Sequence, residues 1–257
     1  MGVGIMFASY PSLRDQTVCI TGGATGIGAS FVRLFAAQGA RVAFLDIDAD
    51  AGSSLTELLS NEQIVPKYIN CDVRNTDHLQ SAIDDVNRDV GPISILINNA
   101  SNDERHSSTI TSEYWDNSMA VNLRHFFFAS QAVYPLMKAA KAGSIINLGS
   151  VTWLLGMPSL PAYSTAKAAI HGLTRTLARE FGKDGIRVNE ICPGAVWTEK
   201  QRIHGFDENQ LHDFIKEKQS LQHVIQPDDV GRMALFLASD DSAMCTGQQF
   251  IVDGGWV

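Results

Sequence analysis

The sequence predicts an α/β fold with a doubly wound parallel sheet, and three observations support this. Short runs rich in Val and Ile alternate with longer segments that have the apolar period of a helix. The chain has 257 residues, a length that one α/β domain commonly reaches. No Pro-, Gly-, Ser- or charge-rich tract divides it, so we expect one domain over 1–257 without a linker.

Seven of the apolar runs are candidate strands. They cover 17–21, 41–46, 64–70, 93–98, 144–149, 186–192 and 248–253. The third run contains Pro66, and a residue without an N–H is tolerated mainly in an edge strand. In the strand order 3-2-1-4-5-6-7 the third strand is an edge, so this proline favours the doubly wound order.

The gaps between these runs carry the predicted helices. They cover 26–38, 75–90, 117–141, 161–182 and 228–238. Residues 197–226 break the alternation between the sixth and seventh strands. Because long insertions near strand ends often become lids, this segment is a candidate substrate lid.

Charge and cysteine content argue against several classes of function. Lys and Arg number 20 and Asp and Glu 28, for a formal charge of −8 without a basic cluster, so we expect no nucleic-acid or membrane partner. The four cysteines form no CxxC pair and the seven histidines no metal-ligand spacing, which predicts a reducing compartment and no metal. The sequence shows no signal peptide or membrane span, so we expect a cytoplasmic protein.

A glycine-rich turn follows the first strand. Gly22, Gly26 and Gly28 in "TGGATGIG" stand where glycine lets the backbone approach a pyrophosphate at a helix N-terminus. The spacing is GxxxGxG instead of the general GxGxxG, and a tight connection without a ligand is the alternative.

An acidic residue ends the second strand. A carboxylate at Asp46 can accept hydrogen bonds from both adenosine ribose hydroxyls and would repel a 2′-phosphate, so the sequence predicts NAD in preference to NADP. The alternative is that Asp46 and Asp48 cap the following helix, for which Asp48 is well placed.

A tyrosine, a lysine and a serine form the candidate reacting group. Tyr163 and Lys167 are four residues apart, on one face of the helix predicted over 161–182. A nearby cation favours the phenolate and lowers its pKa, which makes a base usable near neutral pH. Ser150 follows the fifth strand, at the sheet edge where its hydroxyl can bind a substrate oxygen. Each residue alone is commonly a surface residue, so the prediction depends on their joint spacing.

Taken together, the motifs resemble those of the short-chain dehydrogenase/reductase family. The matching elements, in order across nearly the whole chain, are "TGGATGIG", "NNA" (98–100), Asn122, Ser150, "YSTAK" and "PG" (193–194). The resemblance implies a single Rossmann-type doubly wound domain, usually in a homotetramer, that transfers a hydride between a nicotinamide and an alcohol or carbonyl carbon. Ser101 and Gly149 depart from the family pattern without removing a reacting group.

The resemblance also implies roles for individual residues. Tyr163 would be the general base, Lys167 would lower its pKa and hold the nicotinamide ribose, Ser150 would position the reacting oxygen, and Asn122 would hold a water of the proton relay. The residues expected to hold NAD are Gly22, Thr25, Gly26, Ile27, Gly28, Asp46, Ile47, Asp72, Val73, Asn98, Ala100, Tyr163, Lys167, Pro193, Gly194, Val196 and Thr198.

Longer strings are similar to bacterial sugar dehydrogenases of this family. They include "NDERH", "YWDNSMAVNLRHFFF" and "GSVTWLLGMP", and the likeness implies oxidation of the anomeric carbon of a free aldose such as D-xylose, L-arabinose or L-fucose. A pyranose needs polar partners and a flat apolar wall. The candidate sugar contacts are Asn102, Ser150, Trp153, Tyr163 and Gln201.

Two other functions stay open. A 3-oxoacyl thioester reductase would more naturally use NADPH, so Asp46 and the net charge of −8 speak against it. A dinucleotide-binding sensor or scaffold without catalysis has no need of a matched base, so the complete set of four catalytic residues speaks against it.

Overall fold

Seven parallel strands form one sheet in the order β3-β2-β1-β4-β5-β6-β7, as predicted. The computed structural model describes residues 7–106, 109–204 and 207–257. The strands are β1 Thr17–Thr21, β2 Arg41–Asp46, β3 Lys67–Asn70, β4 Ile95–Asn98, β5 Gly143–Leu148, β6 Ile186–Pro193 and β7 Gln249–Val252. The order reverses between β1 and β4, which is where folds of this kind bind their ligands.

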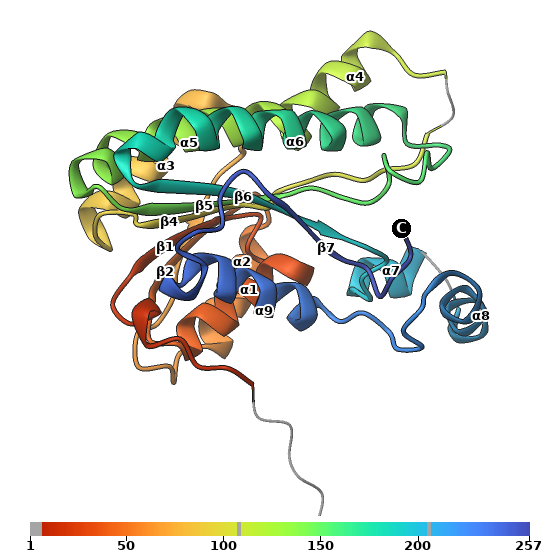
Figure 1. Cartoon of the computed structure of the whole chain (residues 1–257), viewed down its shortest axis with the longest axis horizontal. Helices are drawn as coiled ribbons and strands as arrows, with labels where there is room; N and C mark the ends of the chain where they lie inside the picture. The colour runs from red at the N-terminus through yellow and green to blue at the C-terminus, as the bar shows by residue number, and fades with distance from the viewer. Residues whose placement is uncertain (1–6, 107–108, 205–206) are drawn as a thin grey trace, which may run out of the picture.

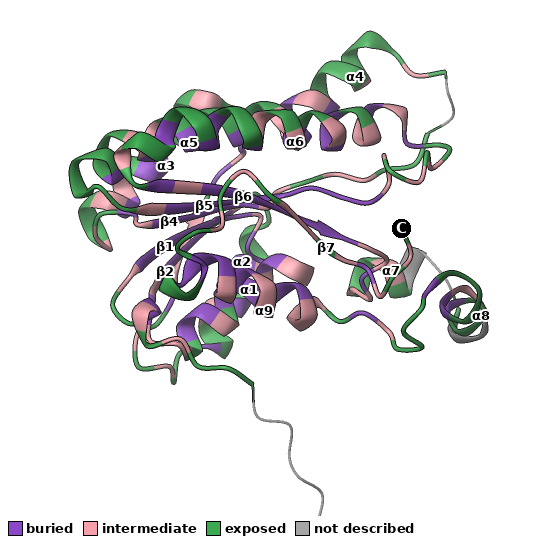
Figure 2. Cartoon of the chain, viewed as in Figure 1, coloured by how far each residue is buried: buried purple, intermediate pink, exposed green. Residues whose placement is uncertain are grey.

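Helices cover both faces of the sheet. Figure 1 shows α3, α5 and α6 on one face and α1, α2 and α9 on the other. The helices are α1 Gly26–Ala37, α2 Ala49–Leu58, α3 Thr76–Asp89, α4 Ser112–Met119, α5 His125–Ala140, α6 Pro161–Phe181, α7 Glu199–His204, α8 Glu208–Lys218 and α9 Pro227–Ala238. Buried residues concentrate in the strands and on the inner helix faces (Figure 2). A sheet covered on both faces explains the nearly continuous apolar runs in the sequence.

Two predicted strands begin too early, for identifiable reasons. The third begins at Lys67, so Pro66 lies just outside an edge strand instead of within it; proline cannot donate to the ladder. The fourth begins at Ile95 instead of residue 93, because the side chain of Asn87 accepts the N–H of Ile93 at 3.0 Å.

The helix predicted over 117–141 is interrupted and begins earlier. It consists of α4, the π-helical turn η2 (Ala120–Arg124) and α5. Helix α4 begins behind Thr111, whose hydroxyl accepts the N–H of Tyr114 at 3.1 Å. Helix α2 is the helix that Asp48 was expected to cap, although its bounds were not predicted. The Asp48 carboxylate is its N-cap and accepts the N–H of Ala51 at 3.0 Å. The Gly and Ser residues of α2 give it low intrinsic helix propensity.

The insertion at 197–226 contains α7 and α8. In Figure 1 both helices lie beyond β7, near the C-terminus. Over residues 7–106, 109–204 and 207–257, no helix is long and apolar enough to cross a membrane. The same residues contain no group of three or more His, Cys, Asp or Glu side chains that could hold a metal ion.

Candidate active site

A cleft of about 740 Å³ opens at the carboxyl ends of the strands. It extends from the glycine turn after β1 to the first residues of α7. Of the residues predicted for cofactor or catalysis, those lining it are Gly22, Thr25, Gly26, Ile27, Gly28, Asp46, Ile47, Asp72, Val73, Ala100, Ser150, Tyr163, Lys167, Pro193, Gly194, Val196 and Thr198. The fold therefore brings residues from most of the chain into one hollow.

The glycine turn requires glycine for steric reasons. Gly22 and Gly26 have positive φ angles of 64° and 55°. A Cβ on Gly28 would stand 1.9 Å from the carbonyl oxygen of Gly22, so no larger residue fits there. Thr25, the N-cap of α1, gives no side-chain cap to the helix, which leaves first-turn N–H groups for an anion. These features fit the pyrophosphate of a dinucleotide.

The carboxylate of Asp46 faces this turn. It accepts the N–H of Ala24 at 2.9 Å and the N–H of Asp48 at 3.1 Å. Each carboxylate oxygen keeps a further lone pair for a hydroxyl. The capping alternative therefore describes Asp48, whereas Asp46 lines the cleft.

A second carboxylate, Asp72, lies along the same part of the cleft with Val73. The guanidinium of Arg74 hydrogen-bonds both of its oxygens at 2.7 to 3.0 Å. These bonds lower the pKa of the Asp72 carboxyl, despite the opposing effect of its partial burial. Arg74 also lines the cleft and was missed, because only the fold brings it there.

Tyr163, Lys167 and Ser150 meet at the deep part of the cleft. The Nζ of Lys167 donates to the carbonyl of Leu148 at 2.7 Å and lies 5.5 Å from the centre of the Tyr163 ring. Ser150 lines the same cleft as Tyr163 and acts to lower the pKa of the Tyr163 phenol. Pro161 stands at the start of α6, as predicted. The arrangement can pass a proton between the phenol and an oxygen held by Ser150.

Burial changes the ionisation of both groups. Desolvation lowers the pKa of Lys167 to about 8. Desolvation raises the pKa of Tyr163, and the Asp103 carboxylate raises it further, although Ser150 opposes this. Loss of hydration therefore holds the Tyr163 pKa above its ordinary value in the protein alone. That Lys167 favours the phenolate stays a prediction.

Two predicted residues lie inside the protein instead of lining the cleft. Asn122 is fully buried in η2, and its side chain bonds both the N–H and the carbonyl of Asn102 at 2.9 Å. It thereby clamps the loop after β4. Asn98 is also fully buried and donates to Asn147 at 2.9 Å, so it supports the sheet edge from inside; the next residue, Asn99, lines the cleft.

The candidate sugar contacts do not all line the cleft. Asn102 and Gln201 line the cleft, but Trp153 does not: its ring centre lies 6.3 Å from that of His171. Tyr114 and Asp103 also line the cleft, and the sequence did not indicate them as contacts. Asp103 forms an ion pair with Lys200, which lies near the start of the segment expected as a lid. The pair joins the loop after β4 to α7, two segments that only the folded chain brings together.

Known proteins resemble the chain over nearly its whole length. A family model described as "Enoyl-(Acyl carrier protein) reductase" matches residues 22–257. A "Probable galactose dehydrogenase" from Rhizobium meliloti (strain 1021) is 46% identical over 250 residues, which cover 96% of this chain and 97% of the relative. A "D-xylose 1-dehydrogenase" from Caulobacter vibrioides (strain NA1000 / CB15N) is 45% identical, with 97% and 98% covered. The crystal structure of "a putative short-chain alcohol dehydrogenase" from Sinorhizobium meliloti 1021 has a TM-score of 0.90 at 29% identity, with 96% and 98% covered.

Proposed function

We infer the function from the family: the chain belongs to the short-chain dehydrogenase/reductase family, and we propose that it oxidises the anomeric carbon of a free aldose with NAD to give an aldonolactone. Members of this family use a nicotinamide dinucleotide. The observation that carries the proposal is the meeting of Ser150, Tyr163 and Lys167 in one cleft with Asn102 and Gln201. Two relatives named for galactose and D-xylose support the sugar substrate.

The four catalytic residues have different tasks in this reaction. The bound nicotinamide supplies the hydride acceptor. Tyr163 takes the proton of the C1 hydroxyl, and Ser150 holds the same oxygen. Lys167 supports the phenolate and holds the nicotinamide ribose. Asn122 fixes the loop that carries Asn102, in addition to its proposed place in a proton relay.

The cleft fits a dinucleotide without a 2′-phosphate. The turn at Gly22 to Gly28 takes the pyrophosphate, Asp46 binds the adenosine ribose, and Asp72 and Val73 flank the adenine. Pro193 to Thr198 cover the nicotinamide. A phosphate on the ribose would meet the negative charge of Asp46, so we propose NAD over NADP.

Replacing Asp46 with Asn is expected to raise the ratio of kcat/KM for NADP to that for NAD by about 10-fold or more, since a hydrogen bond to a charged group contributes about 1.5–3 kcal/mol. The matched control is Asp48→Asn, which weakens the cap of α2 but does not line the cleft. It should leave the ratio unchanged. An unchanged ratio in Asp46→Asn would remove the basis for the NAD preference.

The proposed sugar contacts are Asn102 and Gln201, since Trp153 lies outside the cleft lining. Gln201 belongs to α7, so the segment 197–226 contributes directly to the substrate end of the cleft. This placement supports the proposal that the segment is a substrate lid.

The function is tested by following nicotinamide absorbance with NAD or NADP against D-xylose, L-arabinose, D-galactose, L-fucose, D-glucose and L-rhamnose. Reduction of NAD by one or two of these sugars is the expected result. If no sugar reacts but an acetoacetyl thioester oxidises the reduced cofactor, the enzyme is a thioester reductase and the substrate class proposed above is wrong.

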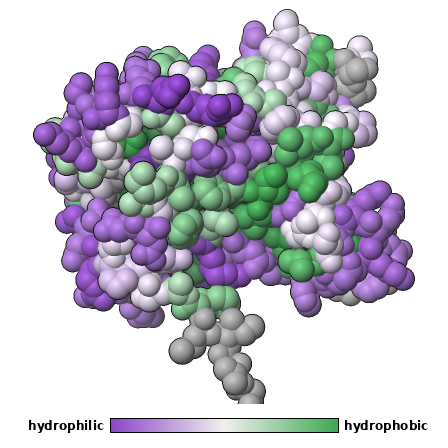
Figure 3. Space-filling model, in the orientation of Figure 1, coloured by the Kyte–Doolittle hydropathy of each residue, from purple (hydrophilic) through white to green (hydrophobic). Residues whose placement is uncertain are grey.

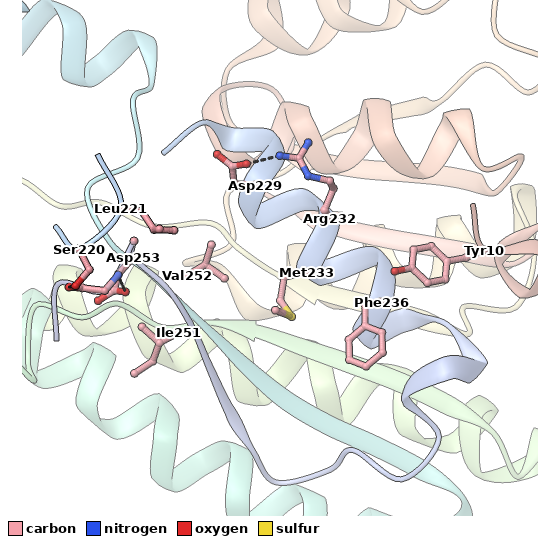
Figure 4. Close-up of a pocket in the computed structure, with 12 residues that line it drawn as sticks. Tyr10, Ser220, Leu221, Asp229, Arg232, Met233, Phe236, Ile251, Val252 and Asp253 are labelled. Carbon is pink, nitrogen blue, oxygen red and sulfur yellow. Dashed lines mark hydrogen bonds and ion pairs between the residues drawn. The ribbon is translucent and has the colours of Figure 1, made fainter. Parts of the chain in front are cut away.

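We also propose a cytoplasmic homotetramer. The C-terminal "IVDGGWV" is similar to family tails that pack at subunit interfaces, and Figure 3 shows hydrophobic residues gathered over β7. Beside them is an open groove of about 690 Å³ between α9 and β7, with Met233, Phe236 and Ile251 among its lining residues (Figure 4). Sedimentation velocity should give the mass of four chains; a monomer at micromolar concentration would contradict the proposal.

The cysteines support the proposed reducing compartment. All four are free.

A further inference from the structure

Strand β6 carries a completely buried carboxylate, Glu190. It accepts hydrogen bonds from the Cys192 thiol at 3.1 Å and from Gln249 Nε2 at 3.4 Å, and the Nδ1 of His171 lies at 2.9 Å. With His171 protonated at Nδ1 all three neighbours are donors, an arrangement that suits an ionised carboxylate, which only accepts. Such a charge is costly to bury, so its position calls for a physical reason.

Glu190 lies directly behind the turn that carries Ser150. A Cβ on Gly149 would stand 2.0 Å from Oε1 of Glu190 and 2.6 Å from the sulfur of Cys192. The carboxylate thus occupies the space that a side chain at 149 would need. This explains why glycine stands where the family commonly has serine, and it ties the conformation before Ser150 to Glu190.

The same carboxylate is linked to the catalytic helix. Tyr163, Lys167 and His171 follow one another at intervals of four residues on one face of α6. His171 binds Glu190, and Lys167 donates to the carbonyl of Leu148, the residue before Gly149. Helix α6 and the end of β5 therefore both connect Glu190 to Lys167.

Among the acidic groups near Lys167, Glu190 is the one whose charge is buried and unscreened. Burial lowers the Lys167 pKa to about 8, and the acidic groups that oppose this effect in their ionised form are Cys192, Glu190 and Asp103. Burial raises the pKa of the Cys192 thiol, so this group is uncharged at working pH. Asp103 is partly exposed and paired with Lys200, so its field is screened.

The remaining titratable neighbours do not replace this charge. Burial lowers the pKa of His125 at the start of α5 to about 3, which leaves it neutral. Tyr163 on α6 has a raised pKa and is neutral before reaction. His171 on α6 faces Glu190 directly, and Gln249 on β7 carries no charge.

We propose that Glu190 is a positioning residue for the catalytic group: its buried charge holds Lys167 in the ammonium form, and its bulk fixes the turn at Gly149 and Ser150. The inference rests on the proposed function, in which a charged Lys167 supports the Tyr163 phenolate. Glu190 acts through these residues and does not touch the substrate.

The test is an NMR titration of Lys167 in protein labelled with ¹³C-lysine, with Lys167→Met identifying the signal. In Glu190→Gln the midpoint for Lys167 should fall by about one unit, the effect of one nearby charge. The kcat should fall by about two- to fivefold at pH values between the two midpoints, and by up to about tenfold above both. The matched control Glu190→Asp keeps the charge and should keep the midpoint. An unchanged midpoint in Glu190→Gln would overturn the proposal.

A second variant covers the case in which Glu190→Gln does not fold. Glu190→Ala combined with Gly149→Ser fills the vacated space without restoring the charge, and the same downward shift is expected; an unchanged midpoint again overturns the proposal. The titration needs no sugar, so failure of the proposed function is recognised separately, as a wild type that oxidises no aldose. If the wild type oxidises an aldose but the Lys167 midpoint does not move in the Glu190 variants, only the proposed role of Glu190 is contradicted.

Discussion

Tyr163→Phe is expected to lower kcat for aldose oxidation by about a thousandfold or more, because the variant lacks the phenol oxygen proposed to take the substrate proton, and such bases contribute about 10²- to 10⁴-fold. The Tyr163 hydroxyl meets Ser150 at the bottom of the cleft. The ring itself remains, so NAD affinity and the melting temperature should change little. Turnover and NAD binding by titration calorimetry measure the two effects separately.

Tyr114→Phe is the matched control for this experiment. Tyr114 also lines the cleft, but its hydroxyl donates to the carbonyl of Glu104 at 3.3 Å, away from the proposed proton path. Its kcat should stay close to the wild-type value. Equal losses in both variants would contradict the assignment of Tyr163 as the base. Binding of NAD without turnover of any substrate by the wild type would instead indicate a sensor or scaffold.

Lys167→Met is expected to abolish most activity and yet to stabilise the fold by about 1–3 kcal/mol at neutral pH, because each unit by which burial lowers the Lys167 pKa costs about 1.4 kcal/mol of stability. The Lys167 side chain is 1% exposed, and burial lowers its pKa from 10.5 to about 8. Met fills similar space without a charge. The lost hydrogen bond to Leu148 offsets part of the gain.

The stability difference between Lys167→Met and the wild type should depend on pH. Between the folded pKa of about 8 and the ordinary value of 10.5, the unfolded state of the wild type binds more protons at Lys167 than the folded state. The titration of Lys167 therefore increases the wild-type free energy of unfolding as the pH rises through that window. Urea unfolding should show the stability advantage of Lys167→Met at neutral pH and a smaller advantage above the Lys167 pKa. A variant less stable than the wild type at neutral pH would contradict the account.

Features with a local cause could be predicted from the sequence. The glycine turn and the spacing of Tyr163 and Lys167 depend on one loop and one helix, and the edge position of β3 was indicated by Pro66. The raised pKa of Tyr163 could not be predicted, because desolvation depends on the packing around the helix.

Contacts between segments that are far apart in the sequence could not be predicted either. The ion pair of Asp103 and Lys200 links residues nearly a hundred positions apart, and Glu190 meets His171 and Gln249 from other elements. Trp153 follows Ser150 by only three residues, yet the turn between them carries its ring toward His171 instead of into the cleft. Sequence spacing alone does not give the direction of a side chain after such a turn.

The central claim is that hydride leaves the anomeric carbon of an aldose, and isotope transfer tests it most directly. The aldose that reduces NAD fastest is prepared with deuterium at C1 and oxidised to completion, and both products are analysed by mass spectrometry. The account predicts deuterated NADH and a lactone without the label. Unlabelled NADH with deuterium retained in the sugar product, or no NADH from any aldose, would contradict it.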